Sequence, residues 1–142
     1  METSRYTTYP FRNGKTARNR VVVPPMASQT ADEKGFATEK TVTHYARLAE
    51  SGAGLIFVEY TFVNVRGQGE PNQLAADADD KIPGLAAIAR TLHKAGALAG
   101  LQLVHVGGKS APGLTGLPLQ QRWFVRQPEE RSCGGSSSGP TR

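Results

Sequence analysis

The chain has 142 residues, 38% hydrophobic and 20% charged, a balance that excludes wholesale disorder and suits one domain with a core. A complete eight-stranded α/β barrel takes about 250 residues and seldom fewer than 200, so a chain of this length is too short for one. The formal net charge is +5, but residues 21–110 carry eight basic and nine acidic side chains, and this near-neutral body argues against nucleic acid as a partner.

The first elements expected along the chain are a hairpin and a short strand. Asn13-Gly14 is the strongest short-range hairpin signal, and we assign residues 1–17 to an N-terminal hairpin or cap. The β-branched run of residues 20–23 predicts a short buried strand. Pro24 and Pro25 are expected to end that strand, because proline cannot donate to a sheet ladder.

Two helices are expected next. Thr38 is suited to cap the first, whose apolar face comprises residues 42, 45, 46 and 49. Asp79 or Asp80 is expected to cap the second, whose apolar face comprises residues 85, 88, 89 and 92. Gly52 and Gly96 stand where left-handed residues end helices.

Each helix leads into an apolar strand. Residues 55–58 predict a strand buried on both faces, and residues 98–103 predict a third strand. Between them, residues 61–78 form a long connection of a length that is usually functional or disordered. Strands that alternate with helices predict right-handed crossovers and a parallel sheet, either doubly wound or a barrel. The first strand–helix turn lacks G-x-G-x-x-G, which disfavours a dinucleotide-binding doubly wound fold.

The ends of the three strands carry the candidate chemistry. In parallel α/β folds, ligands bind at the carboxyl ends of the strands. Polar or sulfur-bearing residues stand there in all three cases, within residues 24–29, 58–63 and 101–109. A structural sheet does not require such residues, so we expect a binding site at this edge.

The chain resembles the Old Yellow Enzyme type of NADH:flavin oxidoreductase/NADH oxidase over about residues 18–110. The matching segments follow one another in the family's order: residues 18–26, 44–45, 52–59, 79–85 and 100–107. The resemblance implies an α/β fold, an FMN-binding (β/α)8 TIM barrel. The chain would hold an incomplete barrel: the first three parallel strands, two helices and the N-terminal hairpin.

The resemblance also implies an activity and a site. The cofactor would be FMN, with NAD(P)H as reductant and a small-molecule acceptor such as an activated alkene as the other substrate. Pro25, Met26 and Ala27 match the segment whose backbone lies against the flavin ring, and Tyr60 falls at a flavin-facing position where the family usually carries a small residue. Gln102 matches the glutamine whose amide, both donor and acceptor, hydrogen-bonds the pyrimidine edge.

Plainer interpretations of these residues stay open. Met26 is also suited to filling a gap in the core, and Tyr60 to packing inside a barrel. Gln102, taken as a buried amide among leucines, needs partners of some kind. His44 and His105 are expected to be structural histidines with their hydrogen bonds satisfied, and Glu59 is suited to balancing a nearby cation.

No catalytic residue and no metal ligand is assigned within the chain. In the family, the paired His/Asn or His/His that binds the substrate follows the fourth strand, where the resemblance stops.

Residues 111–142 are expected to be a low-complexity tail, either disordered or a frameshifted reading of a longer gene, with a natural flexible extension as the alternative. The single Cys133 excludes an internal disulfide, and the absence of a signal peptide or long apolar run favours a cytoplasmic protein without a membrane anchor.

The sequence therefore predicts the N-terminal fragment of an FMN-dependent oxidoreductase, inactive as this chain alone. The alternative is a non-catalytic α/β barrel fragment that assembles with a complementary chain, or a non-functional gene product. A basic nucleic-acid-binding module is a third hypothesis, which the charge distribution disfavours.

Overall fold

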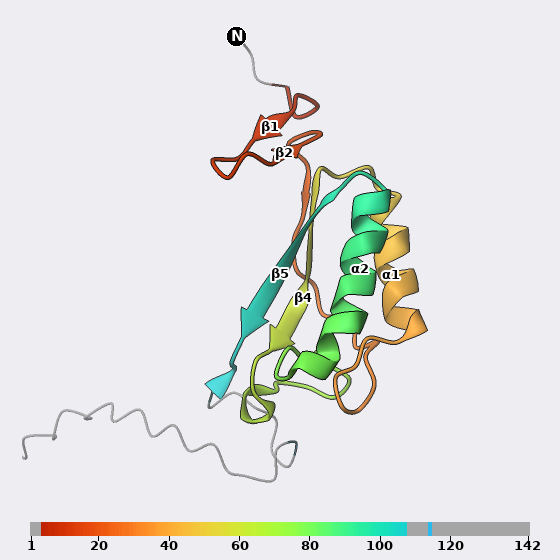
Figure 1. The fold of residues 1–142 in the computed structure, drawn as a ribbon, viewed down its shortest axis with the longest axis vertical. Coiled ribbons are helices and arrows are strands. Elements are labelled where there is room, and N and C mark those ends of the chain that lie inside the picture. Colours follow the sequence, from red (N-terminus) through yellow and green to blue (C-terminus); the bar gives the residue numbers. More distant parts are fainter. Residues whose placement is uncertain (1–3, 108–113, 115–142) are drawn as a thin grey trace, which may run out of the picture.

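The computed structural model describes residues 4–107 and 114, which form two sheets and two helices (Figure 1). The elements follow one another as a hairpin and then strand, helix, strand, helix, strand. Apart from Leu114, the predicted tail of residues 111–142 lies outside the described residues.

A short hairpin precedes the main sheet. Its strands, β1 (Tyr9–Pro10) and β2 (Thr16–Ala17), pair antiparallel. Gly14 takes the turn with a φ of +81°, a left-handed conformation that suits glycine. The prediction from the Asn-Gly pair is confirmed. The hairpin lies beyond the end of the main sheet at which the strands begin (Figure 1).

The main sheet is parallel, as predicted. It has the order β3-β4-β5, formed by β3 (Val22–Val23), β4 (Leu55–Phe62) and β5 (Leu98–Val104). β4 is the central strand. Its buried residues alternate with partly exposed ones at its start, whereas the neighbours Val58 and Glu59 are both buried. The strand predicted at residues 20–23 is shorter than expected and ends before Pro24, as predicted.

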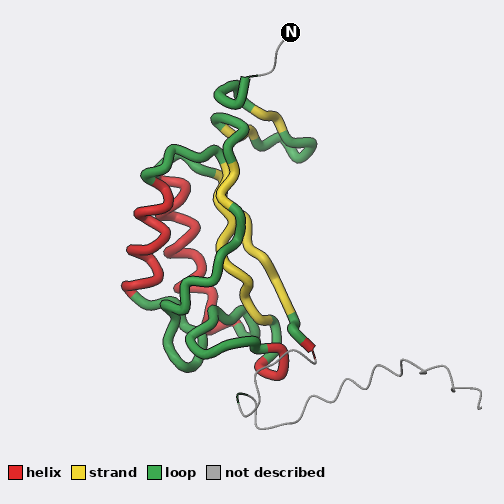
Figure 2. The backbone as a smooth tube through the Cα atoms, turned by 180° about the vertical axis from the view of Figure 1, so that it is seen from behind, coloured by secondary structure: helices red, strands yellow, loops and turns green. Residues whose placement is uncertain are grey.

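Both helices lie on one side of this sheet (Figures 1 and 2). α1 (Glu39–Ala49) begins with Thr38 as its N-cap, in a capping box completed by the Thr41 hydroxyl. α2 (Ile82–Lys94) ends before Gly96, whose φ is +78°. The prediction that Asp79 or Asp80 caps α2 is wrong, because both lie in a 3-10 turn, η2 (Asp79–Lys81), which runs directly into the helix.

The core lies between the helices and the sheet. Its fully buried members come from each helix, from β4 and from the loop after β4: Tyr45, Ile56, Leu74, Ile88 and Leu92. The edge strands are open by comparison. Val22 of β3 is 48% exposed and Leu103 of β5 is 59% exposed, so the expectation of a buried first strand is wrong. The physical reason is that neither strand has a partner on its outer side among the described residues.

Arg18 forms hydrogen bonds with both turns that lead from a helix into a strand, the turn between α1 and β4 and the turn between α2 and β5. Its guanidinium donates to the Ala53 carbonyl (3.1 and 3.3 Å) and to the Ala95 carbonyl (2.8 Å). Ala95 is the C-cap of α2, and Ala53 precedes β4. One cation therefore satisfies a carbonyl in each of the two helix-to-strand turns, just after Gly52 in one and just before Gly96 in the other.

We expect Arg18→Ala to lower the free energy of unfolding by about 1–2 kcal/mol, because charge-assisted hydrogen bonds to two carbonyls are lost. Chemical denaturation followed by circular dichroism measures this difference. Arg12→Ala is the control, since Arg12 is an exposed residue of the hairpin turn. Equal effects of the two substitutions would show that the bridge contributes nothing specific.

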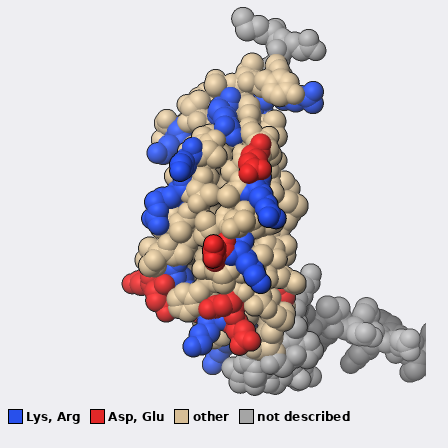
Figure 3. All heavy atoms as spheres, turned by 90° about the vertical axis from the view of Figure 1, so that its right-hand side faces the viewer, with Lys and Arg blue, Asp and Glu red and all other residues tan. Residues whose placement is uncertain are grey.

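The face shown in Figure 3 carries Lys and Arg side chains interspersed with Asp and Glu. It is the right-hand side of Figure 1, where the helices lie. No helix within residues 4–107 is long and apolar enough to cross a membrane.

Candidate functional site

The carboxyl ends of β4 and β5 meet at one edge of the sheet, together with the segment that follows β3 (Figure 1). The loop after β4 folds back over this edge, since Ala75 makes a parallel bridge with Phe62. Gly35 of the loop after β3 accepts a hydrogen bond from Ala75 N–H (3.0 Å). The two loops that border the predicted site are thus fastened to the sheet and to each other.

A buried carboxylate organises the inner side of this edge. Glu59 is fully buried and accepts hydrogen bonds from Ser28 N–H (2.8 Å), Ser28 Oγ (2.5 Å) and, more weakly, Tyr45 Oη (3.4 Å). Its own N–H donates to Tyr45 Oη (2.8 Å). The expectation that Glu59 balances a cation is wrong, because none of its contacts within the described chain is an ion pair.

The local geometry of β4 explains the burial of Glu59. The register with β5 shifts between Val58 and Tyr60, so Glu59 stands at a bulge and has no partner residue on β5. Val58 and Glu59 are both buried as a result. Burial, and then the Glu59 carboxylate, raises the pKa of the Tyr45 phenol far above its usual range, which keeps it a proton donor.

Tyr60 and Gln102, two of the predicted cofactor contacts, stand opposite one another on β4 and β5. Tyr60 is half-buried, whereas Gln102 is exposed. The interpretation of Gln102 as a buried amide is therefore wrong, because β5 is an edge strand of the described sheet. Its amide has no hydrogen-bond partner among the described residues, so both its donor and its acceptor are available to a ligand.

The other predicted contacts follow β3. Met26 is 50% exposed, Ala27 is exposed and Pro25 is half-buried. The interpretation of Met26 as a filler of the core is therefore wrong. The next residue, Ser28, is the one held by Glu59, which fixes the end of this segment beside β4.

The loops after β3 and β4 are joined by side-chain hydrogen bonds that no pattern in the sequence predicts. Gln29 Nε2 donates to Glu70 Oε2 (2.8 Å), and Asn72 Nδ2 donates to the Ala31 carbonyl (2.9 Å). Gln29 and Asn72 adopt left-handed φ values of +52° and +56°. Non-glycine residues in this region are uncommon and cluster where surrounding contacts impose them.

The two histidines expected to be structural, His44 and His105, behave differently. His105 is exposed, and its Nδ1 accepts from Gly107 N–H (3.2 Å), in agreement with a structural role. His44 departs from that expectation, because its buried Nε2 has no hydrogen-bond partner within the described part of the chain. Within residues 4–107, neither histidine is part of a group of three or more side chains that could hold a metal ion.

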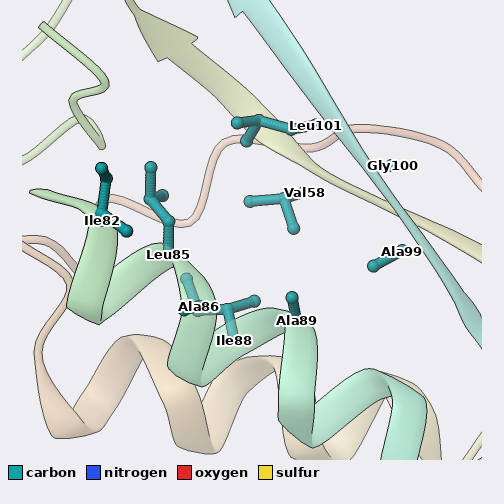
Figure 4. Close-up of a pocket in the computed structure, with 9 residues that line it drawn as sticks. All are labelled: Val58, Ile82, Leu85, Ala86, Ile88, Ala89, Ala99, Gly100 and Leu101. Carbon is teal, nitrogen blue, oxygen red and sulfur yellow. The ribbon is translucent and has the colours of Figure 1, made fainter. Parts of the chain in front are cut away.

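A groove of about 310 Å³ lies between α2 and the outer strand β5 (Figure 4). The side chains that line it are all apolar, among them Val58, Ile82, Leu85 and Leu101. A groove without a polar or titratable side chain offers nothing to orient a reacting ligand. The candidate polar contacts predicted from the sequence therefore lie outside this groove, at the carboxyl edge of the sheet.

Comparison with known proteins adds to this geometry. The sequence pattern of the NADH:flavin oxidoreductase / NADH oxidase family matches residues 9–122. The chain is 35% identical over 99 residues to an NADH oxidase of Thermoanaerobacter brockii, covering 69% of this chain and 15% of that protein. It is 36% identical over 111 residues to an NADPH dehydrogenase of Halalkalibacterium halodurans, covering 78% of this chain and 32% of that protein.

Solved structures show the same relationship. An Old Yellow Enzyme homologue from Zymomonas mobilis superposes with a TM-score of 0.73 and 28% identity, over 80% of this chain and 31% of that one. Morphinone reductase shares the fold, with a TM-score of 0.69 over 82% of this chain. The described strands and helices thus form part of a (β/α)8 barrel, and the chain spans about a third or less of the length of these relatives.

Proposed function

Because the chain belongs to the NADH:flavin oxidoreductase / NADH oxidase family, we propose that it supplies the first three strands of an FMN-dependent NAD(P)H oxidoreductase barrel. The family uses FMN with NAD(P)H as reductant. The acceptor we propose is a small molecule such as an activated alkene. We further propose a cytoplasmic location, in keeping with the single cysteine.

One observation carries this proposal. Tyr60 and Gln102 stand opposite one another at the carboxyl edge of the sheet, and Gln102 presents an amide whose donor and acceptor have no partner among the described residues. The pyrimidine edge of a flavin presents acceptors and a donor in turn, which an amide complements. This complementarity supports the proposal that the edge holds an FMN ring.

The residues of this chain would bind and orient the ring. Gln102 would hold its pyrimidine edge, and the backbone of Pro25, Met26 and Ala27 would lie against its face. Glu59 would act indirectly, because its hydrogen bonds with Ser28 fix the position of the end of that segment. FMN itself supplies the hydride chemistry when it is bound.

The three parallel strands of the described residues do not close a barrel, and we propose that the 142-residue chain alone is inactive. A sheet must close on itself to form a barrel, and phosphate sites in such barrels are built from loops after strands seven and eight. The described strands would therefore contribute the floor under part of the ring.

We expect the purified 142-residue chain neither to retain FMN nor to oxidise NADPH. Absorbance of the purified protein in the visible range and an NADPH oxidation assay with added FMN measure both properties. Yellow protein with one FMN per chain, together with NADPH oxidation, would overturn the proposal that three strands are insufficient.

The second candidate function is assembly with a complementary barrel portion. It is favoured by the outer edges of β3 and β5, which have no strand partner among residues 4–107, and by the exposure of Leu101 (38%) and Leu103 (59%). Mixing the chain with the remaining portion of the Zymomonas mobilis relative, followed by size-exclusion chromatography, tests it. A 1:1 complex is expected, and separate elution of two folded chains would contradict the assembly.

A further inference from the structure

A cleft lies between the hairpin and the first residues of the strands, at the opposite end of the sheet from the candidate flavin site (Figure 1). It consists of two adjoining hollows of about 310 and 390 Å³. Phe11 of the hairpin and Leu55, the first residue of β4, line both hollows. Since β4 has eight residues that rise about 3.3 Å each, this amino-end cleft lies about 20 Å from the carboxyl edge of the sheet.

We propose that the amino-end cleft binds a small organic anion, an aromatic ring system that carries one carboxylate or sulfonate group. The ring system lies on the apolar floor of the cleft beside Phe11, and the anionic group binds Arg20. The cleft is separate from the carboxyl edge of the sheet, so the proposal does not depend on the binding of a flavin.

The floor of the cleft is a row of apolar side chains that crosses the sheet. Val22, Leu55 and Leu98 are in register on β3, β4 and β5. Neighbouring residues of a strand point to opposite faces, and the residues that follow in β3 and β4, Val23 and Ile56, pack in the core under the helices. The first row therefore points away from the helices, and Val22 is 48% exposed. This row offers a ligand an apolar surface.

Two aromatic rings of the hairpin form the opposite wall. Tyr9 and Phe11 are in edge-to-face contact, with their ring centroids 5.0 Å apart and their planes at 79°. Tyr9 is 41% exposed and lines the smaller hollow, whereas Phe11 lines both. Aromatic rings attract one another in edge-to-face and offset-stacked arrangements, so this wall favours an aromatic ligand.

Basic side chains stand at the rim of the cleft. Arg20 lines the smaller hollow, and Lys15 and His93 line the larger one. No Asp or Glu among the described residues lines either hollow. Residues 4–20, which include the hairpin, contain five Arg or Lys and no acidic residue. The cleft therefore favours an anion over a neutral or cationic ligand.

Arg20 is the basic residue whose position is fixed by other contacts. Its guanidinium carbon lies 4.9 Å from the centroid of the Tyr9 ring, and its Nε donates to Thr7 Oγ1 (3.1 Å). Its two terminal nitrogens have no hydrogen-bond partner within the described chain, whereas the Arg18 guanidinium is occupied by backbone carbonyls. A planar guanidinium with free N–H groups binds a carboxylate or sulfonate through charge-assisted hydrogen bonds. The cleft thus combines apolar walls with one fixed polar group, as small-molecule sites do.

The test uses the full 142-residue chain and a matched pair of fluorescent probes. 8-Anilinonaphthalene-1-sulfonate carries the anionic group, and N-phenyl-1-naphthylamine is the same ring system without it. The rise in fluorescence on titration measures the affinity for each probe. We expect the chain to bind one molecule of the sulfonate probe, and to bind it more tightly than the neutral probe, because only the sulfonate accepts charge-assisted hydrogen bonds.

Variants of Arg20 separate the charge from the apolar surface. Arg20→Ala is expected to weaken binding of the sulfonate probe about tenfold, the effect of losing a charge-assisted hydrogen bond, and to leave binding of the neutral probe unchanged. Arg20→Lys keeps the charge and is expected to recover part of the affinity. Arg66→Ala, at an exposed residue of η1 (Val65–Gly67), is the matched control and is expected to change neither affinity.

Amide chemical shifts locate the bound probe. In ¹H–¹⁵N spectra of the labelled chain, the sulfonate probe is expected to shift the amides of Phe11 and Leu55 and to leave that of Leu85, in the groove beside α2, unchanged. Gln102→Ala is expected to leave the affinity unchanged, since Gln102 belongs to the candidate flavin site. Loss of probe binding in Gln102→Ala, or shifts at Leu85 without shifts at Phe11 and Leu55, would overturn the proposal.

Two further outcomes would also contradict it. One is equal affinity of the unmodified chain for the two probes, a comparison that holds even where a variant fails to fold. The other is the same affinity for the sulfonate probe in Arg20→Ala and Arg66→Ala, both shown to be folded by circular dichroism. Because these measurements need no FMN, a chain that never binds FMN can still bind the anionic probe.

Discussion

Replacing Glu59 with alanine is expected to lower the free energy of unfolding by about 3 kcal/mol or more, because removing one partner of a buried polar network leaves the others unsatisfied. Three donor groups lose their acceptor at once: Ser28 N–H, Ser28 Oγ and Tyr45 Oη. The substitution also leaves a cavity behind a fully buried side chain. Urea denaturation at neutral pH measures the loss.

Glu59→Gln distinguishes the carboxylate from the space that it fills. Glutamine keeps the volume but offers only one acceptor oxygen, so its NH₂ group faces the Ser28 N–H donor or hydroxyl. We expect an intermediate loss of about 1–2 kcal/mol from this mismatch. Glu33→Ala, at an exposed position, is the control and is expected to be neutral. A loss in Glu59→Ala no larger than in Glu33→Ala would contradict the account of the network.

The second large effect is expected at Gly35, in the loop after β3. Its φ is +80°, and an added Cβ would lie 2.4 Å from Ala75 Cβ, 3.0 Å from Ala75 N and 3.2 Å from the Gln73 carbonyl. Gly35→Ala is therefore expected to cost about 1–2 kcal/mol for the left-handed backbone and about 1–3 kcal/mol for the overlap. The loop after β3 would then separate from the loop after β4, with loss of protection of the Ala75 amide in hydrogen exchange.

Gly14→Ala is a matched control for this prediction. Gly14 has a φ of +81°, almost the same as Gly35, but nothing lies within 4 Å of an added Cβ. It should therefore show the backbone cost without the overlap. If both variants lose the same stability, the close approach of the two loops does not constrain the site.

Much of the fold could be predicted from local patterns. The Asn-Gly pair located the hairpin, Thr38 located the start of α1, and the glycines after the helices have left-handed conformations. Alternation of apolar strands with helices predicted the parallel sheet. These features depend on residues that are close in sequence, so a single sequence reveals them.

Exposure of the strands could not be predicted in the same way. The apolar runs of β3 and β5 are typical of buried strands, yet Val22 and Leu103 are largely exposed. Burial depends on which neighbours lie beside and above a strand, and the composition of the strand does not specify them. The error over Gln102 has the same origin.

The segments that meet at the carboxyl edge of the sheet could be predicted from the sequence, whereas the binding site expected there stays a prediction and its contacts were foreseen only in part. Tyr60 and Gln102 stand side by side, although their roles toward a cofactor stay predictions. The Glu59–Ser28–Tyr45 network depends on a bulge in β4, and the Gln29–Glu70 contact joins loops 41 residues apart. No spacing or motif in the sequence signals either arrangement, because both arise from tertiary packing.

The central claim is that the carboxyl edge of β3, β4 and β5 forms the flavin floor of an oxidoreductase barrel. The most direct measurement joins residues 1–107 to the portion of the Zymomonas mobilis relative that follows its corresponding third strand, and determines the FMN content of the purified chimaera. We predict a folded yellow protein with about one FMN per chain, and an FMN affinity that falls about tenfold in Gln102→Ala, the effect of losing one well-placed hydrogen bond. Thr43→Ala, on the exposed side of α1, is expected to leave the affinity unchanged. A folded chimaera that holds no FMN, or whose affinity is indifferent to Gln102, would contradict the account.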